Sequence, residues 1–172
     1  MFPCSSAYAI PGGWNVKRTW VSYLFWILLA EGVGGLSGWL TREGIALYNT
    51  NAVKPFLTPP AIVFPIVWGI LFALMGLGAA RVWNSEASVV RARALEIFLL
   101  QLGVNFFWSI VFFNMQAYGL AFLWILVLWA LIFWMIQLFR QVDPLAARLQ
   151  IPYLLWVSFA AYLNFATWML NR

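Results

Sequence analysis

Long uncharged stretches separated by short polar segments dominate this chain. No charged residue occurs between Lys54 and Arg81, and 43 uncharged residues run from Ile97 to Phe139. A helix needs about 20 apolar residues to cross the hydrocarbon core of a bilayer. The first stretch therefore predicts one crossing, and the second is long enough for two, divided at the turn-like segment 114–119.

This pattern predicts an all-α integral membrane protein with a five-helix transmembrane bundle. Residues 1–18 are expected to form a flexible tail, and residues 19–172 the transmembrane domain. The longest connection, 41–58, is expected to be a loop that covers a ligand. Pro59 and Pro60 are expected in the first turn of the second helix, where a missing N–H costs little. The expected spans are 20–40, 59–83, 92–113, 118–139 and 149–170.

The composition argues against several structural and functional classes. The chain has 65% hydrophobic and 9% charged residues, whereas soluble domains carry about 25% charged residues. It has one cysteine and no histidine, so no internal disulfide, transition-metal site or histidine-based catalysis is expected. Phosphate-binding loops, paired carboxylates and nucleophile–base motifs are also missing from the sequence. An enzymatic activity stays open only in a form that needs no acid–base pair.

The basic residues predict an orientation in the membrane and no binding of nucleic acid. With five spans, seven basic residues share the side of the N-terminus and three lie on the other side. By the positive-inside rule the N-terminus is cytoplasmic and the first loop faces outward. We expect a bacterial inner membrane. The larger group is Lys17, Arg18, Arg81, Arg91, Arg93, Arg140 and Arg148, and the smaller is Arg42, Lys54 and Arg172.

Polar and aromatic residues inside the spans recur at helical spacing and form three stripes that can converge on one aromatic pocket. Amides in these stripes can instead bond one helix to another, and both interpretations stay open. The stripes are Trp68, Phe72, Met75 and Ala79 in the second span; Gln101, Asn105, Trp108, Ser109 and Phe112 in the third; and Tyr153, Trp156, Ala160 and Asn164 in the fifth.

The first span contains a carboxyl group and a helix face made of glycines. Glu31 is costly at membrane depth, so it is either a functional intramembrane residue or a group that helix tilt brings near an interface. Gly34 and Gly38 form a small-xxx-small pair that allows close packing within the bundle or in a dimer.

Three separated segments resemble a known family. KPFLTPP leading into FPIVWGILFALMGLGAARVW, then QLGVNFFWSIVFF, then PYLLWVSFAAYLNFATWMLN are similar to the signature segments of the TspO/MBR family, the tryptophan-rich sensory and translocator proteins, also called peripheral-type benzodiazepine receptors. The similarity covers residues 48–171. One departure is Leu57, where many members have Trp, so a less aromatic pocket mouth is expected.

The resemblance implies a five-helix protein, often dimeric, whose pocket opens toward the first loop and binds porphyrins, sterols or benzodiazepine-type ligands. Trp68 and Trp156 match the pair that the family links to light-dependent porphyrin breakdown, which makes them the candidate catalytic residues. The matching pocket positions are Tyr48, Trp68, Phe72, Gln101, Asn105, Trp108, Trp156 and Ala160.

The leading hypothesis is a membrane receptor or sensor for a flat tetrapyrrole such as protoporphyrin IX or heme, acting as a homodimer without an obligatory cofactor. The alternatives are an enzyme that degrades porphyrin with light and oxygen, and a transporter of porphyrin-like or sterol-like molecules.

Overall fold

The computed structural model describes the backbone of residues 15–172 and the side chains from Thr19 onward. Within that range all the regular secondary structure is helical. The helices are α1 (Asn15–Leu40), α2 (Arg42–Asn51), α3 (Val63–Trp83), α4 (Val89–Ser109), the π-helical turn η1 (Ile110–Asn114) that continues α4, α5 (Tyr118–Val142), α6 (Pro144–Arg148) and α7 (Ile151–Leu170).

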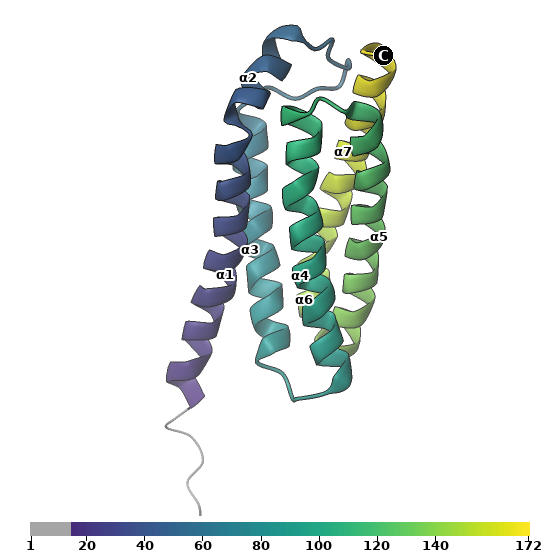
Figure 1. Cartoon of the computed structure of the whole chain (residues 1–172). Helices are drawn as coiled ribbons and strands as arrows, with labels where there is room; N and C mark the ends of the chain where they lie inside the picture. Colours follow the sequence, from purple (N-terminus) through teal and green to yellow (C-terminus); the bar gives the residue numbers. More distant parts are fainter. Residues whose placement is uncertain (1–14) are drawn as a thin grey trace, which may run out of the picture.

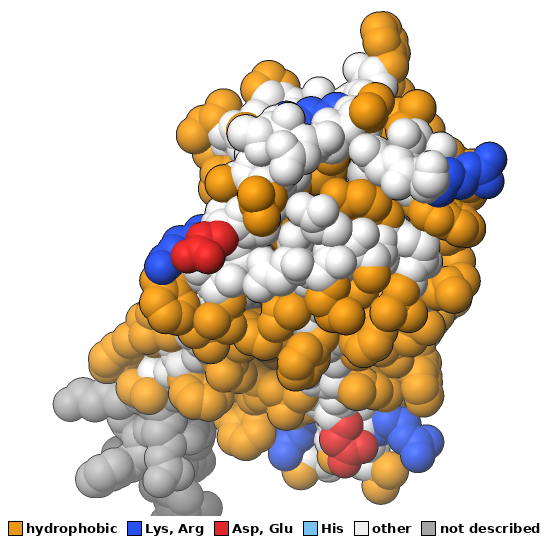
Figure 2. Space-filling model, turned by 45° about the horizontal axis from the view of Figure 1, so that its top comes forward, with side chains coloured by type: hydrophobic (Ala, Val, Ile, Leu, Met, Phe, Trp, Pro, Cys, Tyr) orange, Lys and Arg blue, Asp and Glu red, His pale blue; other side chains and the backbone are white. Residues whose placement is uncertain are grey.

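The five long helices stand side by side in an antiparallel bundle, and the two ends of the described chain lie at opposite ends of it (Figure 1). All five are long and apolar enough to span a membrane, as the fold prediction requires. Hydrophobic side chains cover the flank, whereas basic and acidic side chains gather toward the two ends (Figure 2). The prediction of an all-α, five-span membrane protein is confirmed.

The region predicted as a covering loop contains a helix. Residues 42–51 form α2, with Glu43 in its first turn, where a negative charge favours the helix dipole. Gly44 is buried and lies directly against the backbone of Phe113. Only residues 52–62 form an irregular connection, so the cover is a short helix followed by a strap.

The observed starts of two helices also differ from the predicted ones. Pro59 and Pro60 precede α3, because the chain enters through a tighter turn in which the Val63 N–H donates to the Pro60 carbonyl at 2.9 Å. At the N-terminus, residues 15–18 already belong to α1 and not to a tail. The rest of the predicted tail lies outside the described residues.

Close backbone contact joins α1 to α3. Gly76 of α3 lies against the backbone of Trp26 and Ile27 in α1, and a Cβ at this position would overlap them. Gly34 of α1 packs in the same way on the ring of Phe72. These glycines let the two helices approach more closely than side chains would permit.

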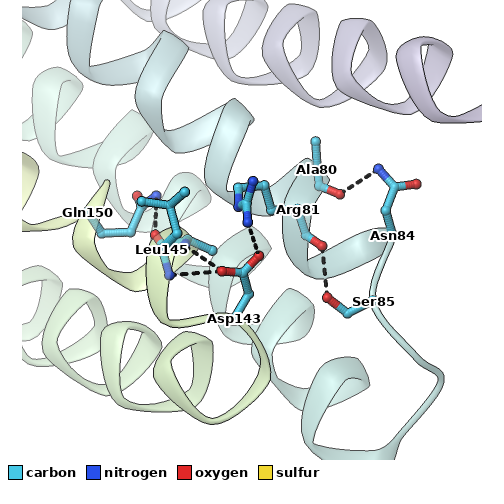
Figure 3. A network of polar contacts seen from close by, with 8 residues as sticks. Ala80, Arg81, Asn84, Ser85, Asp143, Leu145 and Gln150 are labelled. Atoms are coloured by element: carbon cyan, nitrogen blue, oxygen red, sulfur yellow. Dashed lines mark hydrogen bonds and ion pairs between the residues drawn. The ribbon is translucent and has the colours of Figure 1, made fainter.

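A polar network closes the end of the bundle away from α2 (Figure 3). Arg81 of α3 pairs with Asp143 at 2.8 Å, and Asp143 caps α6 by accepting from the N–H groups of Leu145 and Ala146. Burial opposes ionisation of Asp143. The N–H of Ala146, the Arg81 guanidinium and the N–H of Leu145 outweigh burial and lower its pKa. The pair therefore fixes α3 to the α5–α6 corner as a charged contact.

Candidate ligand-binding site

A cavity of about 580 Å³ lies in the α2 half of the bundle. Its walls come from α1, α3, α4, η1 and α7, and α2 with the following strap covers it. Small-molecule sites commonly have volumes of about 300–1,000 Å³ and mostly apolar walls. The cavity is thus large enough for a sizeable organic ligand.

Paired aromatic rings build its walls. On α3, Trp68 stacks on Phe72 with ring centroids 5.5 Å apart. Where α4 passes into η1, Trp108 stacks on Phe112 at 5.2 Å. Trp156 of α7 meets another lining ring, Phe64, edge to face at 5.9 Å. Each stacked pair follows from a spacing of four residues, which places both rings on one helix face.

The π-helical turn adds to this wall. Phe112 and Phe113 are adjacent in sequence, yet both line the cavity, and their rings are in edge-to-face contact at 4.9 Å. Both rings also contact the Tyr48 ring of α2. A π-turn inserts a residue into the helical repeat and changes its register, and such turns are frequent at functional sites. Here the turn joins the wall to the cover.

Most polar groups of the upper cavity already have partners. The Trp108 indole N–H donates to Asn164 Oδ1 at 3.2 Å, and Asn164 Nδ2 donates to the Tyr118 carbonyl at 2.8 Å. Tyr48 lies 3.4 Å from Thr167, hydroxyl to hydroxyl. By contrast, the buried Nε1 of Trp156 has no hydrogen-bond partner among the described residues. This indole N–H is therefore an unpaired donor covered by neighbouring protein atoms.

A hydrogen-bonded chain forms the floor of the cavity. Asn105 Nδ2 donates to the Tyr153 hydroxyl at 2.9 Å, and that hydroxyl donates to Gln101 Oε1 at 2.9 Å. Asn105 lines the cavity, whereas Gln101 and Tyr153 do not. Both lie one turn deeper on α4 and α7 and are fully buried. Below them the core is closed by large side chains such as Met75, Phe98 and Phe139.

The strap is tied to the opposite end of the chain. The N–H of Val53 donates to Asn171 Oδ1 at 2.9 Å, and Asn171 Nδ2 donates to the Val53 carbonyl at 3.0 Å. Lys54 reaches Asn49 at 3.0 Å and stands 5.9 Å from the centre of the Tyr48 ring. The strap is therefore held at its rim by a few polar contacts.

Comparison with known proteins identifies the family. The sequence model of the TspO/MBR family matches residues 21–169. The chain belongs to the TspO/MBR family.

Several TspO/MBR relatives are similar over most of their length. The tryptophan-rich protein TspO of Chlorobaculum tepidum is 38% identical over 84% of this chain and 91% of its own. The tryptophan-rich sensory protein of Cereibacter sphaeroides is 36% identical over 91% of this chain and 95% of its own. The human translocator protein is 35% identical over 76% of this chain and 78% of its own.

Most of the residues predicted from the TspO/MBR resemblance line this one cavity. Gln101 is the exception, because it belongs to the floor. Glu31, whose place was uncertain, also lines the cavity. The predicted residues that line it are Tyr48, Trp68, Phe72, Asn105, Trp108, Trp156, Ala160, Glu31 and Asn164.

Other lining residues were not predicted from the sequence. Phe64 lies one turn before Trp68 on the same face of α3, so helical spacing alone could have indicated it. Lys54 and Thr58 sit on the strap, where no periodicity exists to place them. Leu57, the departure from the TspO/MBR pattern, does not line the cavity and is 54% exposed.

Proposed function

We propose that the protein is a membrane receptor or sensor that binds a flat hydrophobic tetrapyrrole in this cavity. The observation that carries the proposal is the set of aromatic rings from three different helices around one space, among them Trp68, Trp108 and Trp156. Ring faces stack well on a planar conjugated molecule and bury it from water and lipid. Membership in a family of tryptophan-rich sensory and translocator proteins supports the same assignment.

The chemistry of the wall is suited to binding. Stacking and burial of apolar surface provide most of the affinity, and few polar groups then orient the ligand. Asn105 at the floor is one such group, because it borders the cavity while its Nδ2 is held by Tyr153.

Titration of the purified protein with protoporphyrin IX, followed by tryptophan quenching, tests the proposal. We expect saturable binding that weakens at least tenfold in a Trp68→Phe/Trp156→Phe double variant. A Trp20→Phe/Trp134→Phe variant is the control, because both side chains are exposed and lie outside the cavity. Equal affinities in the two double variants would refute the proposed site.

A second function, the breakdown of porphyrin with light and oxygen, is favoured by one observation. Trp68 and Trp156, the pair that the family resemblance links to this chemistry, line the same cavity. Illumination of the aerobic complex distinguishes the two functions. An enzyme forms a new absorbing product that the Trp68→Phe/Trp156→Phe variant lacks, and free porphyrin with tryptophan is the control. A receptor returns the porphyrin unchanged.

We also propose that the protein works as a homodimer in a bacterial inner membrane, with the α2 end facing outward. The family resemblance and the bacterial relatives support this assignment. Light scattering of the detergent-solubilised protein measures the mass of the assembly, and a monomeric mass would count against the dimer.

A further inference from the structure

A second hollow lies between α3 and α7, with a volume of about 430 Å³. Leu71 is buried in it, whereas Ile70 and Leu155 are 58% and 65% exposed. The hollow is therefore a groove that opens to the surroundings of the bundle, and we call it the α3–α7 groove. Among its lining residues, Trp156 is the one that also lines the cavity beneath α2. The groove is lined by Val67, Ile70, Leu71, Leu74, Pro152, Leu155, Trp156 and Phe159.

Loose packing between α3 and α7 explains the groove. Its lining residues recur every three or four positions on each helix, so each set forms one helix face. However, α3 packs more closely on α1, and α7 on α5, than α3 and α7 pack on each other. The ring of Trp156 meets Phe64 edge to face at 5.9 Å, and Trp68 meets Tyr153 at 6.2 Å. The outer side of this seam is left open.

The depth of the groove in the membrane determines what can cover it. Both of its helices belong to spans long and apolar enough to cross a bilayer, Val63–Trp83 and Pro144–Leu170. Along α3 the groove begins at Val67, about 6 Å of helix rise inside the helix, and Leu74 lies about 13 Å before its other end. At such depth the protein is surrounded by lipid tails and not by water or headgroups.

We propose that the α3–α7 groove is a binding site for an acyl chain of a bilayer phospholipid. From Val67 to Leu74 the groove follows about 10 Å of helix rise. This length is less than the hydrocarbon depth of one leaflet, about 15 Å, so part of a single chain can fill it. The site goes beyond the proposed function, because both its occupant and its opening differ from those of the cavity.

Packing is the force that retains the chain. Inside a bilayer the hydrophobic effect does not favour one apolar contact over another, so van der Waals contact decides which surfaces associate. A chain in the groove touches side chains of two helices at once, whereas a chain on a convex helix surface touches one. The chain also reaches Trp156, so lipid in the groove touches a residue that walls the cavity.

A phospholipid with a photoreactive diazirine in the middle of one acyl chain tests the proposal on the full-length protein in detergent. Irradiation at an equimolar ratio, followed by peptide mass spectrometry, maps the labelled residues. We expect label in the groove to exceed that on Leu126 and Val127 about fivefold, because the groove offers the chain more contacts. Both comparison residues are exposed on α5 and lie outside the groove. They lie close to its depth, since Trp129 of α5 bonds Ser158 of α7.

Competition and groove-filling variants identify the part of the lipid that binds. Excess unlabelled phospholipid should remove the label from the groove, whereas glycerophosphocholine, which has the headgroup without chains, should not. In an Ile70→Trp/Leu155→Trp variant, two indoles at the exposed edges of the groove should reduce its labelling about fivefold. Val127→Trp is the matched control and should leave groove labelling unchanged. Thermal unfolding of each variant shows whether it is folded.

The outcomes decide the inference without reference to porphyrin. Equal labelling of the groove and α5 would overturn it, as would label in the groove that excess phospholipid does not displace. A groove that stays unlabelled while α5 is labelled would mean that something else covers it, such as a second copy of the chain. Because no tetrapyrrole is present, the lipid site and the proposed function can fail independently. These measurements on the wild type stand even if the double variant does not fold.

Discussion

Asp143 shows how a single side chain can join three helices. Its carboxylate caps α6 and pairs with Arg81 of α3 directly after the end of α5. Its side chain is 16% exposed and that of Arg81 is 33% exposed, so the pair is less screened than a surface ion pair. Replacing Asp143 by Asn isolates the contribution of the ion pair to stability, because asparagine caps helices about as well as aspartate.

We expect Asp143→Asn to lower the free energy of unfolding by about 1.5–3 kcal/mol at neutral pH, as for hydrogen bonds to charged groups. The pKa of Asp143 is lowered in the folded protein. Its contribution is therefore complete above the unfolded pKa of about 3.9 and is lost as the pH falls through the folded value. Thermal unfolding in detergent at pH 7 and at pH 3 measures both effects.

The difference in the free energy of unfolding between wild type and Asp143→Asn should be smaller at pH 3 than at pH 7. Glu43→Gln serves as the control, because the Glu43 side chain is 87% exposed. If wild type and Asp143→Asn differ in stability by the same amount at both pH values, the carboxylate charge does not contribute to folding stability.

Among the elements, α3 has three glycines, and two of them have opposite surroundings. A Cβ on Gly76 would overlap the α1 backbone, whereas a Cβ on Gly69 would meet no atom within 4 Å. We expect Gly76→Ala to destabilise the protein by about 1–3 kcal/mol through forced separation of α1 and α3. Gly69→Ala should be neutral or stabilise by up to about 1 kcal/mol, since alanine favours a helix. Thermal unfolding of the two variants, compared side by side, checks this prediction.

Hydrophobic patterning predicted the long helices because crossing a bilayer requires long uncharged runs. It did not predict α2, whose ten residues include Gly44 and two asparagines. Contacts with η1 hold this helix, through Gly44 against Phe113 and Tyr48 against the Phe112 ring. Contacts of this kind join segments that are far apart in the chain, so they produce no local pattern in the sequence.

Helical spacing predicted which helix faces carry the polar residues of the candidate site, but not how far the cavity extends along those helices. Helical spacing placed Gln101 and Asn105 on one face of α4, and both do point toward α7, where they flank Tyr153. Periodicity says nothing about where along a helix a cavity ends. The floor depends on the Tyr153 hydroxyl between the two amides, and only the packed bundle determines that position.

For the whole molecule, the orientation in the membrane can be tested directly. In a Cys4→Ser background, single cysteines introduced at Ala87 and Thr50, both of which are exposed, report on the two ends of the bundle. We expect an impermeant thiol reagent to label Thr50→Cys in intact cells and Ala87→Cys only after the membrane is opened. The reverse labelling pattern would invert the proposed topology.

The hydrogen-bonded floor also closes the cavity on the side away from α2. Passage straight through the bundle would require both Tyr153 hydrogen bonds to break and the fully buried side chains beneath, such as Met75 and Phe98, to separate. An unpaired buried polar group costs about 1–3 kcal/mol, and the packed core adds to that barrier. In this structure the cavity is therefore closed toward the end of the bundle opposite α2 and resembles a dead-end chamber, not a tunnel.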